Sequence, residues 1–493
     1  MKISRLFSPI TKLFKRRKRK GKAAKKAFGR KSAIKDFLPN IVVKFNDNIS
    51  FPYQEDSDVR EYLSTNKMFP WQQLHEKFPD IRIGKLFNSV KPEEIKTMVE
   101  EIKKSNPGYQ PPNFLACASI EYPVSDYGKD LLAAIVDSKI VDYAYIESDA
   151  SPSFNVDGSN PALPEQGYLN RAPQGINAKY AWGKDGGKGE STVQFIDIEQ
   201  GWALNHTDLP GNIPLLYGVN SEFLSHGAAV LGVIFMQDNG EGGVGIAHRA
   251  SPQLISQIVE RTDSNGRVRK ANIVNDAIMK AISQLHFGDV LLIESQVHDE
   301  DFRIWPVETR RMTFDLIELA TKKGIIVIEP AGNGDDSTSP DGNNLDEYKN
   351  ALENKILDRT SGNNDFKDSG AIMVAAASDQ EEHSKLRSSN FGNRIDCFAW
   401  GKNVYTADDP AILNDSSRPD PDKPYWNFSG TSSAAAIIAG AAIVVQSIVE
   451  ASDRPRLNPA QMREILSKNG TSSERIGVMP DLKKIIDEVL PSL

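Results

Sequence analysis

The sequence contains only two cysteines, Cys117 and Cys397, among its 493 residues. Two thiols cannot build the disulfide framework of a small secreted domain, although a single bridge between them stays arithmetically open. We therefore expect a reducing compartment, and the cytoplasm is the predicted location. The chain also lacks an uninterrupted run of about 18 apolar residues, which argues against a transmembrane helix.

Acidic residues are absent from the first 35 positions, which carry 15 Lys and Arg, whereas the remaining 458 carry 44 basic and 66 acidic residues. An acidic body therefore follows a basic arm, and the body is not expected to bind nucleic acid. The start of the arm does not resemble a secretory signal peptide, because Ser4, Arg5, Ser8 and Pro9 interrupt its apolar residues.

Residues 1–37 are predicted to form this basic arm, either disordered or amphipathic. Ile3, Leu6, Phe7 and Ile10 follow helical spacing, and six consecutive basic residues occupy positions 15–20. A solvated tail is one interpretation. Contact of residues 1–35 with an anionic membrane is a second, which would make the protein membrane-associated. A nuclear address, a transit peptide or a nucleic-acid contact are further alternatives.

The pattern of residues 38–150 predicts a small α+β domain. Strand-like segments at 41–45, 114–122 and 140–146 alternate with helical segments at 92–104 and 129–138. Residues 151–165 are predicted to be a linker, because three prolines stand among Ser, Asn and Gly too densely for a helix or strand.

From residue 166 to residue 490, apolar strand segments alternate with long helical segments. Strands are expected at 192–196, 254–258, 290–293 and 325–328, and helices at 270–285 and 307–323. This alternation is typical of a parallel sheet with helices on both faces. The predicted fold class is therefore α/β, with a mostly parallel, doubly wound sheet.

Polar residues at the ends of these segments are candidates for chemistry. Asp197 closes one strand and Asn333 shortly follows another, at the edge where ligands gather in such sheets. His226 opens an apolar helical segment, and the small Gly227 behind it would let another element approach the imidazole. Taken singly, Asp197 also fits a cap or a turn, and His226 fits a satisfied core residue.

Ser432 lies in a Gly-Thr-Ser turn before a long apolar helical segment that runs to about Val449. A hydroxyl at the first turn of a buried helix lies near unpaired backbone N–H groups and the positive end of the helix dipole, which favour an oxyanion. Capping of the helix by Thr431 or Ser432 is an equal alternative.

Together these segments resemble the subtilisin-like serine peptidases, the subtilases. The order Asp197, His226, Asn333, Ser432 is that of the family, and unrelated serine hydrolases use other orders. The resemblance covers residues 165–490 and extends to further motifs, which are Gly186-Gly187-Lys188-Gly189, Gly243-Val244-Gly245-Ile246-Ala247, Ala331-Gly332-Asn333-Gly334, Asn390-Phe391-Gly392 and Phe398-Ala399-Trp400-Gly401.

The resemblance implies a serine endopeptidase that acts on proteins or peptides through an acyl-enzyme intermediate. Ser432 would attack the carbonyl, His226 would move the proton, and Asp197 would hold the imidazole. Asn333 and the Ser432 backbone N–H would bind the oxyanion. A catalytically weak or inactive scaffold, which binds peptides and is targeted by its basic arm, is the alternative.

Substrate contacts are also implied by the resemblance. The expected peptide groove has Ser295, Gln296 and Val297 along one edge and Ala331 and Gly332 along the other. Glu294 and Glu329 either face the first specificity pocket, where they would favour a basic substrate residue, or pair with buried structural bases. Residues 38–150 stand where many subtilases carry a propeptide, and a permanent docking domain is the alternative.

Some positions depart from the family pattern. Asp197-Ile198-Glu199 replaces Asp-Ser/Thr-Gly, Ala228 and Ala229 replace Thr and His, and Ala436 replaces Pro. None of these changes removes a predicted triad member. No cofactor or metal is required by the expected chemistry. The segment 335–368 is either a surface insertion or a Ca²⁺ site, with the candidate ligands Asp335, Asp336, Asp341, Asn343, Asn344 and Asp346.

Overall fold

The structure, a computed structural model, describes residues 37–66, 71–78, 80–123, 127–147, 166–263, 265–334, 341–412 and 424–492. The chain divides into two units, Met1–Phe37 and Leu38–Leu493. The predictions for the basic arm, apart from Phe37, and for the linker 151–165 lie outside the described residues.

A nine-stranded sheet with the order β18-β19-β15-β14-β13-β10-β5-β7-β6 forms the centre of the region after residue 166. All its strand pairs are parallel except β18 with β19. The strands are β5 (Phe195–Glu199), β6 (Leu215–Tyr217), β7 (Pro252–Ser256), β10 (Val290–Ile293), β13 (Ile326–Pro330), β14 (Ile372–Ala377), β15 (Cys397–Trp400), β18 (Gly470–Ser473) and β19 (Gly477–Pro480). The predicted mostly parallel α/β sheet is confirmed.

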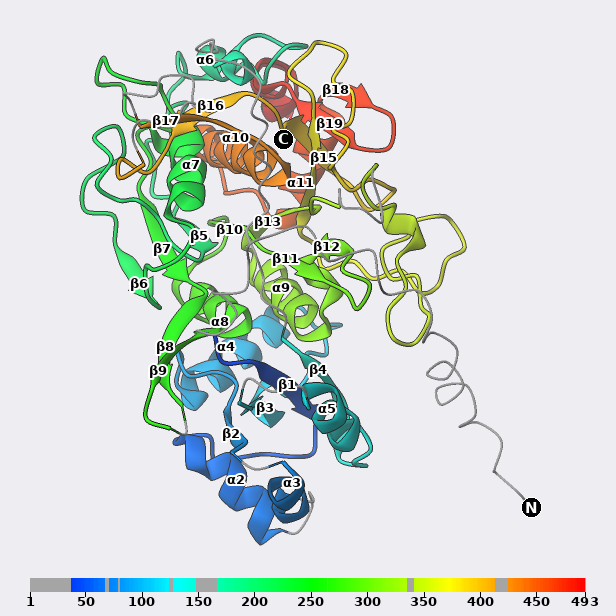
Figure 1. The fold of residues 1–493 in the computed structure, drawn as a ribbon. Helices are drawn as coiled ribbons and strands as arrows, with labels where there is room; N and C mark the ends of the chain where they lie inside the picture. Colours follow the sequence, from blue (N-terminus) through cyan, green and yellow to red (C-terminus); the bar gives the residue numbers. More distant parts are fainter. Residues whose placement is uncertain are drawn as a thin grey trace. The chain divides into compact units, whose positions relative to one another are not determined.

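Helices cover both faces of this sheet (Figure 1). On one face α7 (Leu224–Phe235) packs against α10 (Thr431–Ala451), and on the other α8 (Val274–Gln284) packs against α9 (Arg311–Lys323). The central strands β10, β13 and β14 are buried along their whole length, as expected for strands that are shielded on both sides.

Helix α10 runs through the core, and its residues from Thr431 to Val449 are all buried. By length and composition it could span a membrane, but its most apolar window is wholly buried within the fold. The expectation that no segment would suit a membrane span is therefore corrected, because Ser, Gly and Gln interrupt the apolar run without making the helix polar. Burial on all sides explains why this helix is apolar around its circumference.

Two predicted helices begin later than expected. Residues predicted to start α8 instead form β9 (Val268–Asn272), which pairs with β8 (Ile258–Thr262) in an antiparallel hairpin. Helix α9 follows a short 3₁₀ turn at Val307–Thr309. The remaining short elements are α6 (Ala178–Ala181), β11 (Gln296–His298), β12 (Ile304–Pro306), β16 (Val404–Ala407), β17 (Tyr425–Phe428), α11 (Pro459–Lys468) and α12 (Leu482–Lys484).

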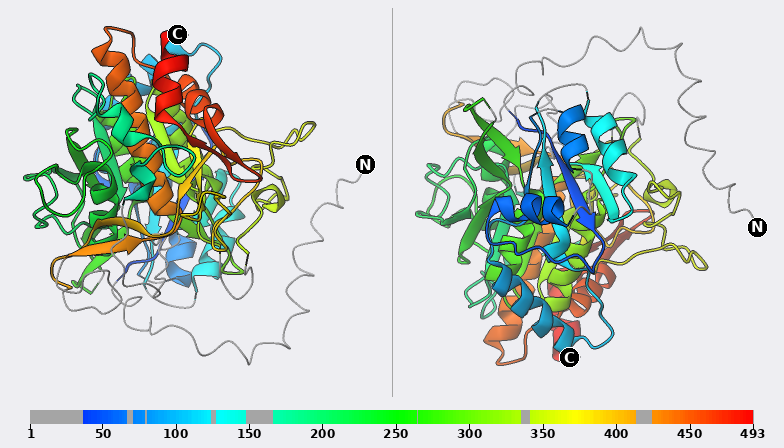
Figure 2. Two further views of the ribbon diagram at one scale, coloured as in Figure 1. Left: turned by 90° about the horizontal axis from the view of Figure 1, so that it is seen from above. Right: turned by 90° about the horizontal axis from the view of Figure 1, so that it is seen from below.

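Residues 38–147 build a separate four-stranded antiparallel sheet with the order β2-β3-β1-β4. Its elements are β1 (Asn40–Phe45), α2 (Asp56–Thr65), α3 (Trp71–Lys77), β2 (Arg82–Lys85), α4 (Pro92–Ser105), β3 (Cys117–Glu121), α5 (Gly128–Val136) and β4 (Val141–Ile146). The view from below in Figure 2 shows these blue and cyan elements in front of the green core. Helices α2 and α3 and strand β2 are absent from the sequence prediction.

Polar contacts join this layer to α8 and α9. Asn275 Nδ2 donates to Glu147 Oε2 at 2.8 Å, and the Tyr143 hydroxyl donates to Asp315 Oδ2 at 3.2 Å. Ser89 Oγ donates to Asp276 Oδ1 at 2.5 Å. The N-terminal layer therefore lies on the helices that cover the sheet face opposite α7 and α10.

Candidate active site

The register of the central strands brings distant residues together at one edge of the sheet. Strand β5 ends at Glu199, and β10 ends one residue before Glu294. Ile198 is the partner of Ile293, and Glu294 N–H donates to Ile198 O at 3.1 Å. Because neighbouring parallel strands end at the same edge, the two glutamates emerge side by side.

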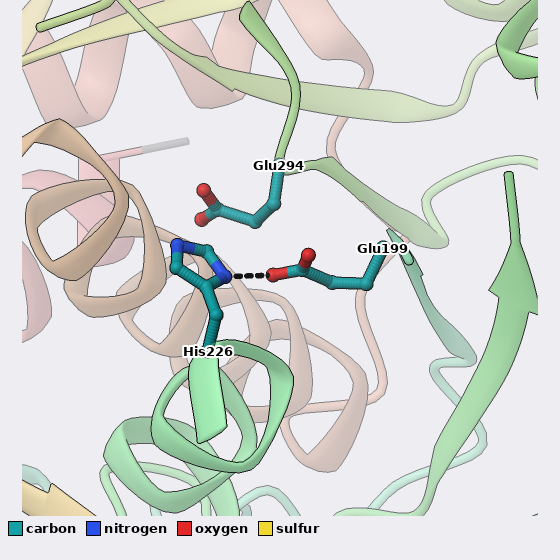
Figure 3. Close-up of side chains that lie close together, drawn as sticks. All are labelled: Glu199, His226 and Glu294. Atoms are coloured by element: carbon teal, nitrogen blue, oxygen red, sulfur yellow. Dashed lines mark hydrogen bonds and ion pairs between the residues drawn. The ribbon is translucent and has the colours of Figure 1, made fainter. Parts of the chain in front are cut away.

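His226 is the third residue of α7 and is 2% exposed. Its Nδ1 lies 2.5 Å from Glu199 Oε1 (Figure 3), and its ring packs edge-on against Phe428 with centroids 5.2 Å apart. A Cβ added at Gly227 would lie 2.2 Å from Gly201 O and 2.4 Å from Trp202 Cδ1. The prediction that Gly227 allows another element to approach closely is therefore confirmed.

The Asp197 carboxylate is fully buried in the same part of the site and interacts electrostatically with His226. Its Oδ2 accepts a hydrogen bond from Trp202 Nε1 at 2.8 Å. Burial raises the pKa of Asp197 well above its ordinary range, and the nearby Glu199 charge acts in the same direction. Because Glu199 is hydrogen-bonded to His226, it is a second candidate for the role that the sequence predicted for Asp197, and the role of Asp197 stays a prediction.

Glu199 reaches the imidazole because it lies two residues after Asp197 on the same strand. Side chains two apart on a strand point to the same side of the sheet, so both carboxylates face the α7 side. Glu199 is fully buried. Burial raises its pKa well above the ordinary value, and a backbone hydrogen bond from Gln200 acts against this.

Glu294 supplies a third carboxylate to the site, and in Figure 3 it lies above the His226 ring, which Glu199 reaches from the right. Glu294 is fully buried, and neither of its carboxylate oxygens has a hydrogen-bond partner among the described residues. Burial raises the pKa of Glu294 well above its usual range, nearby Glu199 and Asp197 raise it further, and the Ser432 hydroxyl lowers it.

Ser432 lies in the first turn of α10, one residue after the helix begins at Thr431. The preceding Gly430 has φ +101°, a conformation that favours glycine, and no side chain caps the helix. Ser432 is fully buried, and its Oγ takes part in no hydrogen bond with the described residues. Helix capping therefore does not account for this hydroxyl.

Asn333 is held beside the same turn. Its Oδ1 accepts hydrogen bonds from Thr431 N–H at 3.0 Å and from Thr431 Oγ1 at 3.1 Å. Its own N–H donates to Gln296 Oε1 at 3.0 Å. With the oxygen fixed in this way, the side-chain Nδ2 is a buried donor without a partner among the described residues. Such a donor next to Ser432 suits a developing negative charge.

The residues predicted to line the peptide groove have structural partners as well. Gln296 and Val297 belong to β11, which pairs antiparallel with β12, and Ser295 Oγ donates to Gln257 Oε1 at 2.6 Å. Ala331 N–H donates to Val374 O at 2.8 Å, and the Gly332 carbonyl accepts from Asn390 N–H at 3.0 Å. A role in substrate binding stays a prediction for all five residues.

Glu329 is the buried partner of a structural base, one of the two readings that the sequence allowed. Its carboxylate lies 3.9 Å from the fully buried Arg394. Arg394 also pairs with Glu308 at 2.7 Å and with Asp396 at 2.8 Å.

The candidate calcium ligands that the structure describes have local hydrogen bonds. Asn343 Nδ2 donates to Ile304 O at 2.9 Å, and Asp346 Oδ1 accepts from Asn393 N–H at 2.7 Å. Asp335 and Asp336 lie outside the described residues. Calcium binding stays a prediction.

Glu199, His226 and Glu294 place one donor atom each within 4.8 Å of one another, the kind of grouping that can hold a metal ion. The donor that His226 would offer on Nδ1 is already engaged with Glu199. A serine hydroxyl and an amide donor adjoin the group, so its chemistry also suits proton transfer; the absence of a metal requirement stays a prediction.

Comparisons with known proteins address the family and the fold. The sequence model of the subtilase family matches residues 215–479, more than half of the chain. Fervidolysin from Fervidobacterium pennivorans, described as a keratinolytic enzyme related to subtilisin, is similar in structure with a TM-score of 0.50 at 16% identity. The match covers 92% of this chain and 62% of the fervidolysin chain.

A structure described as proteases from Pseudoalteromonas arctica matches with a TM-score of 0.42 at 18% identity, over 66% of this chain and 98% of that one. No curated protein sequence matches. The family match spans His226, Glu294, Asn333 and Ser432, and the structural likeness to fervidolysin supports the same fold. The chain belongs to the subtilase family of serine peptidases.

Proposed function

We propose that the protein is a serine endopeptidase in which Ser432 is the nucleophile, His226 the general base and Glu199 the acid that holds the imidazole. The observation that carries this proposal is the 2.5 Å contact between His226 Nδ1 and the buried Glu199 carboxylate. The Ser432 hydroxyl also supports it, because it lies in the first turn of α10 and does not cap the helix.

The proposed reaction begins with attack of Ser432 Oγ on the substrate carbonyl. His226 Nε2 takes the hydroxyl proton and later gives it to the leaving amine, while Glu199 holds the Nδ1–H and stabilises the imidazolium. Asn333 Nδ2 and the Ser432 backbone N–H donate to the oxyanion of the tetrahedral intermediate. Water then attacks the acyl-enzyme. His226 takes a proton from the water and returns it to Ser432 Oγ as the acid product leaves.

Peptide binding without turnover is the second candidate. One observation favours it, which is that Ser432 is fully buried and Asn333 is 5% exposed. A substrate must therefore gain access to the hydroxyl before it can be cleaved.

A fluorophosphonate probe separates the two candidates, because it reacts with an activated serine and not with an ordinary hydroxyl. We expect labelling of the wild-type protein and none of Ser432→Ala, together with hydrolysis of labelled casein by the wild type alone. Absence of both labelling and hydrolysis in folded wild-type protein would support the peptide-binding scaffold.

The same pair of proteins tests processing of the N-terminal region. Intact-mass measurement of the wild type beside Ser432→Ala would reveal a new N-terminus within 148–165 in the wild type alone if the enzyme removes residues 38–147 itself. Cytoplasmic location and membrane contact through residues 1–35 stay predictions from the sequence.

A further inference from the structure

Glu294 and Asp197 are the two buried carboxyl groups of this site that the proposed reaction does not use, and Asp197 is already engaged with Trp202. The Glu294 side chain is fully buried, and both of its carboxylate oxygens lack a hydrogen-bond partner among the described residues. An ionised carboxylate in such a place would lose its hydration without hydrogen bonds that replace it. The neighbouring groups must therefore explain why a carboxyl group is buried at this position.

The charged groups around Glu294 come from the elements packed at this edge of the sheet. Asp197 and Glu199 extend from β5, and His226 extends from α7, while the neutral Ser432 hydroxyl comes from α10. Three carboxyl groups thus share a buried space with one imidazole, which carries at most one positive charge. Mutual repulsion and desolvation require that the group retains at least one proton on its carboxylates.

Hydrogen bonding indicates where this proton resides. The Glu199 carboxylate is within 2.5 Å of His226 Nδ1, and the Asp197 carboxylate accepts from Trp202 Nε1. Both ionised forms are thereby stabilised, whereas the donor near the Glu294 carboxylate among the described residues is the Ser432 hydroxyl, which forms no hydrogen bond of normal geometry with it. Burial and the two neighbouring carboxylates raise the pKa of Glu294, although the Ser432 hydroxyl opposes them.

We propose that Glu294 is a positioning residue that must carry a proton for Ser432 to react. This inference rests on the proposed peptidase function. A neutral Glu294 carboxyl next to Ser432 leaves the imidazole able to accept the hydroxyl proton and places no negative charge beside the oxyanion. The proton stays on Glu294 throughout the reaction, so the transfers between Ser432, His226 and the leaving amine are unchanged.

Ionisation of Glu294 opposes catalysis in two ways. The carboxylate would be a second negative charge close to the imidazolium, besides Glu199, and would hold the ring in its protonated form. It would also repel the oxyanion that Asn333 binds. We therefore expect the rate to fall about tenfold for each pH unit above the titration of Glu294.

The test compares pH profiles of full-length wild type, Glu294→Gln and Glu329→Gln. The rates to measure are hydrolysis of labelled casein and labelling by the fluorophosphonate, from about pH 5 to about pH 10. Glutamine keeps the shape of Glu294 and cannot ionise, so Glu294→Gln is expected to lose the alkaline decline of the wild type and to exceed its rate at every pH where that decline has begun. Glu329, an equally buried carboxyl on β13 beside Arg394, is the matched control, and its variant should keep the wild-type decline.

Two outcomes would overturn the inference. One is a Glu294→Gln profile that matches the wild type, and the other is a folded Glu294→Gln that is inactive at every pH. Glu294→Met, which is neutral and of similar volume, is the second variant. Failure of both variants to fold would assign Glu294 a purely structural role. A wild type that neither labels nor hydrolyses casein at any pH would contradict the proposed function itself, which is a different result.

Discussion

At the residue scale, two carboxylates on one strand compete for a single role. Asp197 and Glu199 are both fully buried on β5, yet Glu199 contacts the imidazole and Asp197 contacts Trp202. The carboxylate of a serine peptidase triad fixes the tautomer of the histidine, and an amide in its place favours the wrong one. Substitution of each carboxylate in turn therefore tests which of the two fixes the His226 tautomer.

Glu199→Gln is expected to lower kcat by about 10⁴-fold, the size of the effect in other serine peptidases when the triad carboxylate becomes an amide. Asp197→Asn should lower kcat by less than about tenfold, because asparagine can still accept from Trp202. Steady-state hydrolysis of labelled casein measures both, with circular dichroism to verify folding. A larger loss of kcat in Asp197→Asn than in Glu199→Gln would instead show that Asp197 holds the imidazole.

At the element scale, the position of α7 depends on close contact with the loop that follows β5. Gly227, the residue after His226, leaves no room for a methyl group between α7 and Gly201 and Trp202. Trp202 in turn donates to Asp197. This contact fixes both the helix that carries the imidazole and the strand that carries its carboxylate partner.

Gly227→Ala is expected to destabilise the protein by about 1–3 kcal/mol, because the added methyl group overpacks the contact with the Gly201 carbonyl and the buried Trp202 indole. Gly211→Ala is the control, since nothing lies within 4 Å of a Cβ at that position. Urea unfolding followed by tryptophan fluorescence measures the difference, in the Ser432→Ala background to prevent self-cleavage. Equal stability of the two variants would show that α7 can shift without loss.

At the scale of the whole molecule, the layer formed by residues 38–147 rests on α8 and α9 through buried acids. Burial raises the pKa of Glu147 to about 7, against the opposing effects of Arg310 and Asn275. It likewise raises the pKa of Asp315 to about 7, although Arg311 and the Tyr143 hydroxyl act against it. Both acids lie where the two layers meet, so the stability of the contact between the layers depends on the pH.

The sign of this effect follows from the raised pKa. The stabilising contribution of a protonated Glu147 is fully present below its ordinary pKa of 4.5 and is lost as the pH rises through about 7. Glu147→Gln should therefore stabilise the protein at pH above 7, by up to about 3 kcal/mol, and change little below pH about 4.5. Urea unfolding at the two extremes, in the Ser432→Ala background, measures the difference. A gain that is the same at both pH values would contradict the assignment.

The sequence by itself determined the parallel α/β sheet and the order of the motifs. Buried strands and helices such as β13 and α10 have local apolar patterns that can be read without the fold, and Asn333 and Ser432 follow from their places at the ends of these elements. The hairpin β8–β9 was not found, because its polar, partly exposed residues have no clear period.

Only the tertiary structure showed that Glu199 is hydrogen-bonded to His226 and which groups surround the imidazole. Asp197 and Glu199 point to the same side of β5, so the strand period cannot distinguish them, and the family pattern favoured Asp197. Glu294 joins them through the pairing of β5 with β10, between residues 95 apart in sequence. Such non-local register depends on the packing of the whole sheet, and no local pattern of residues records it.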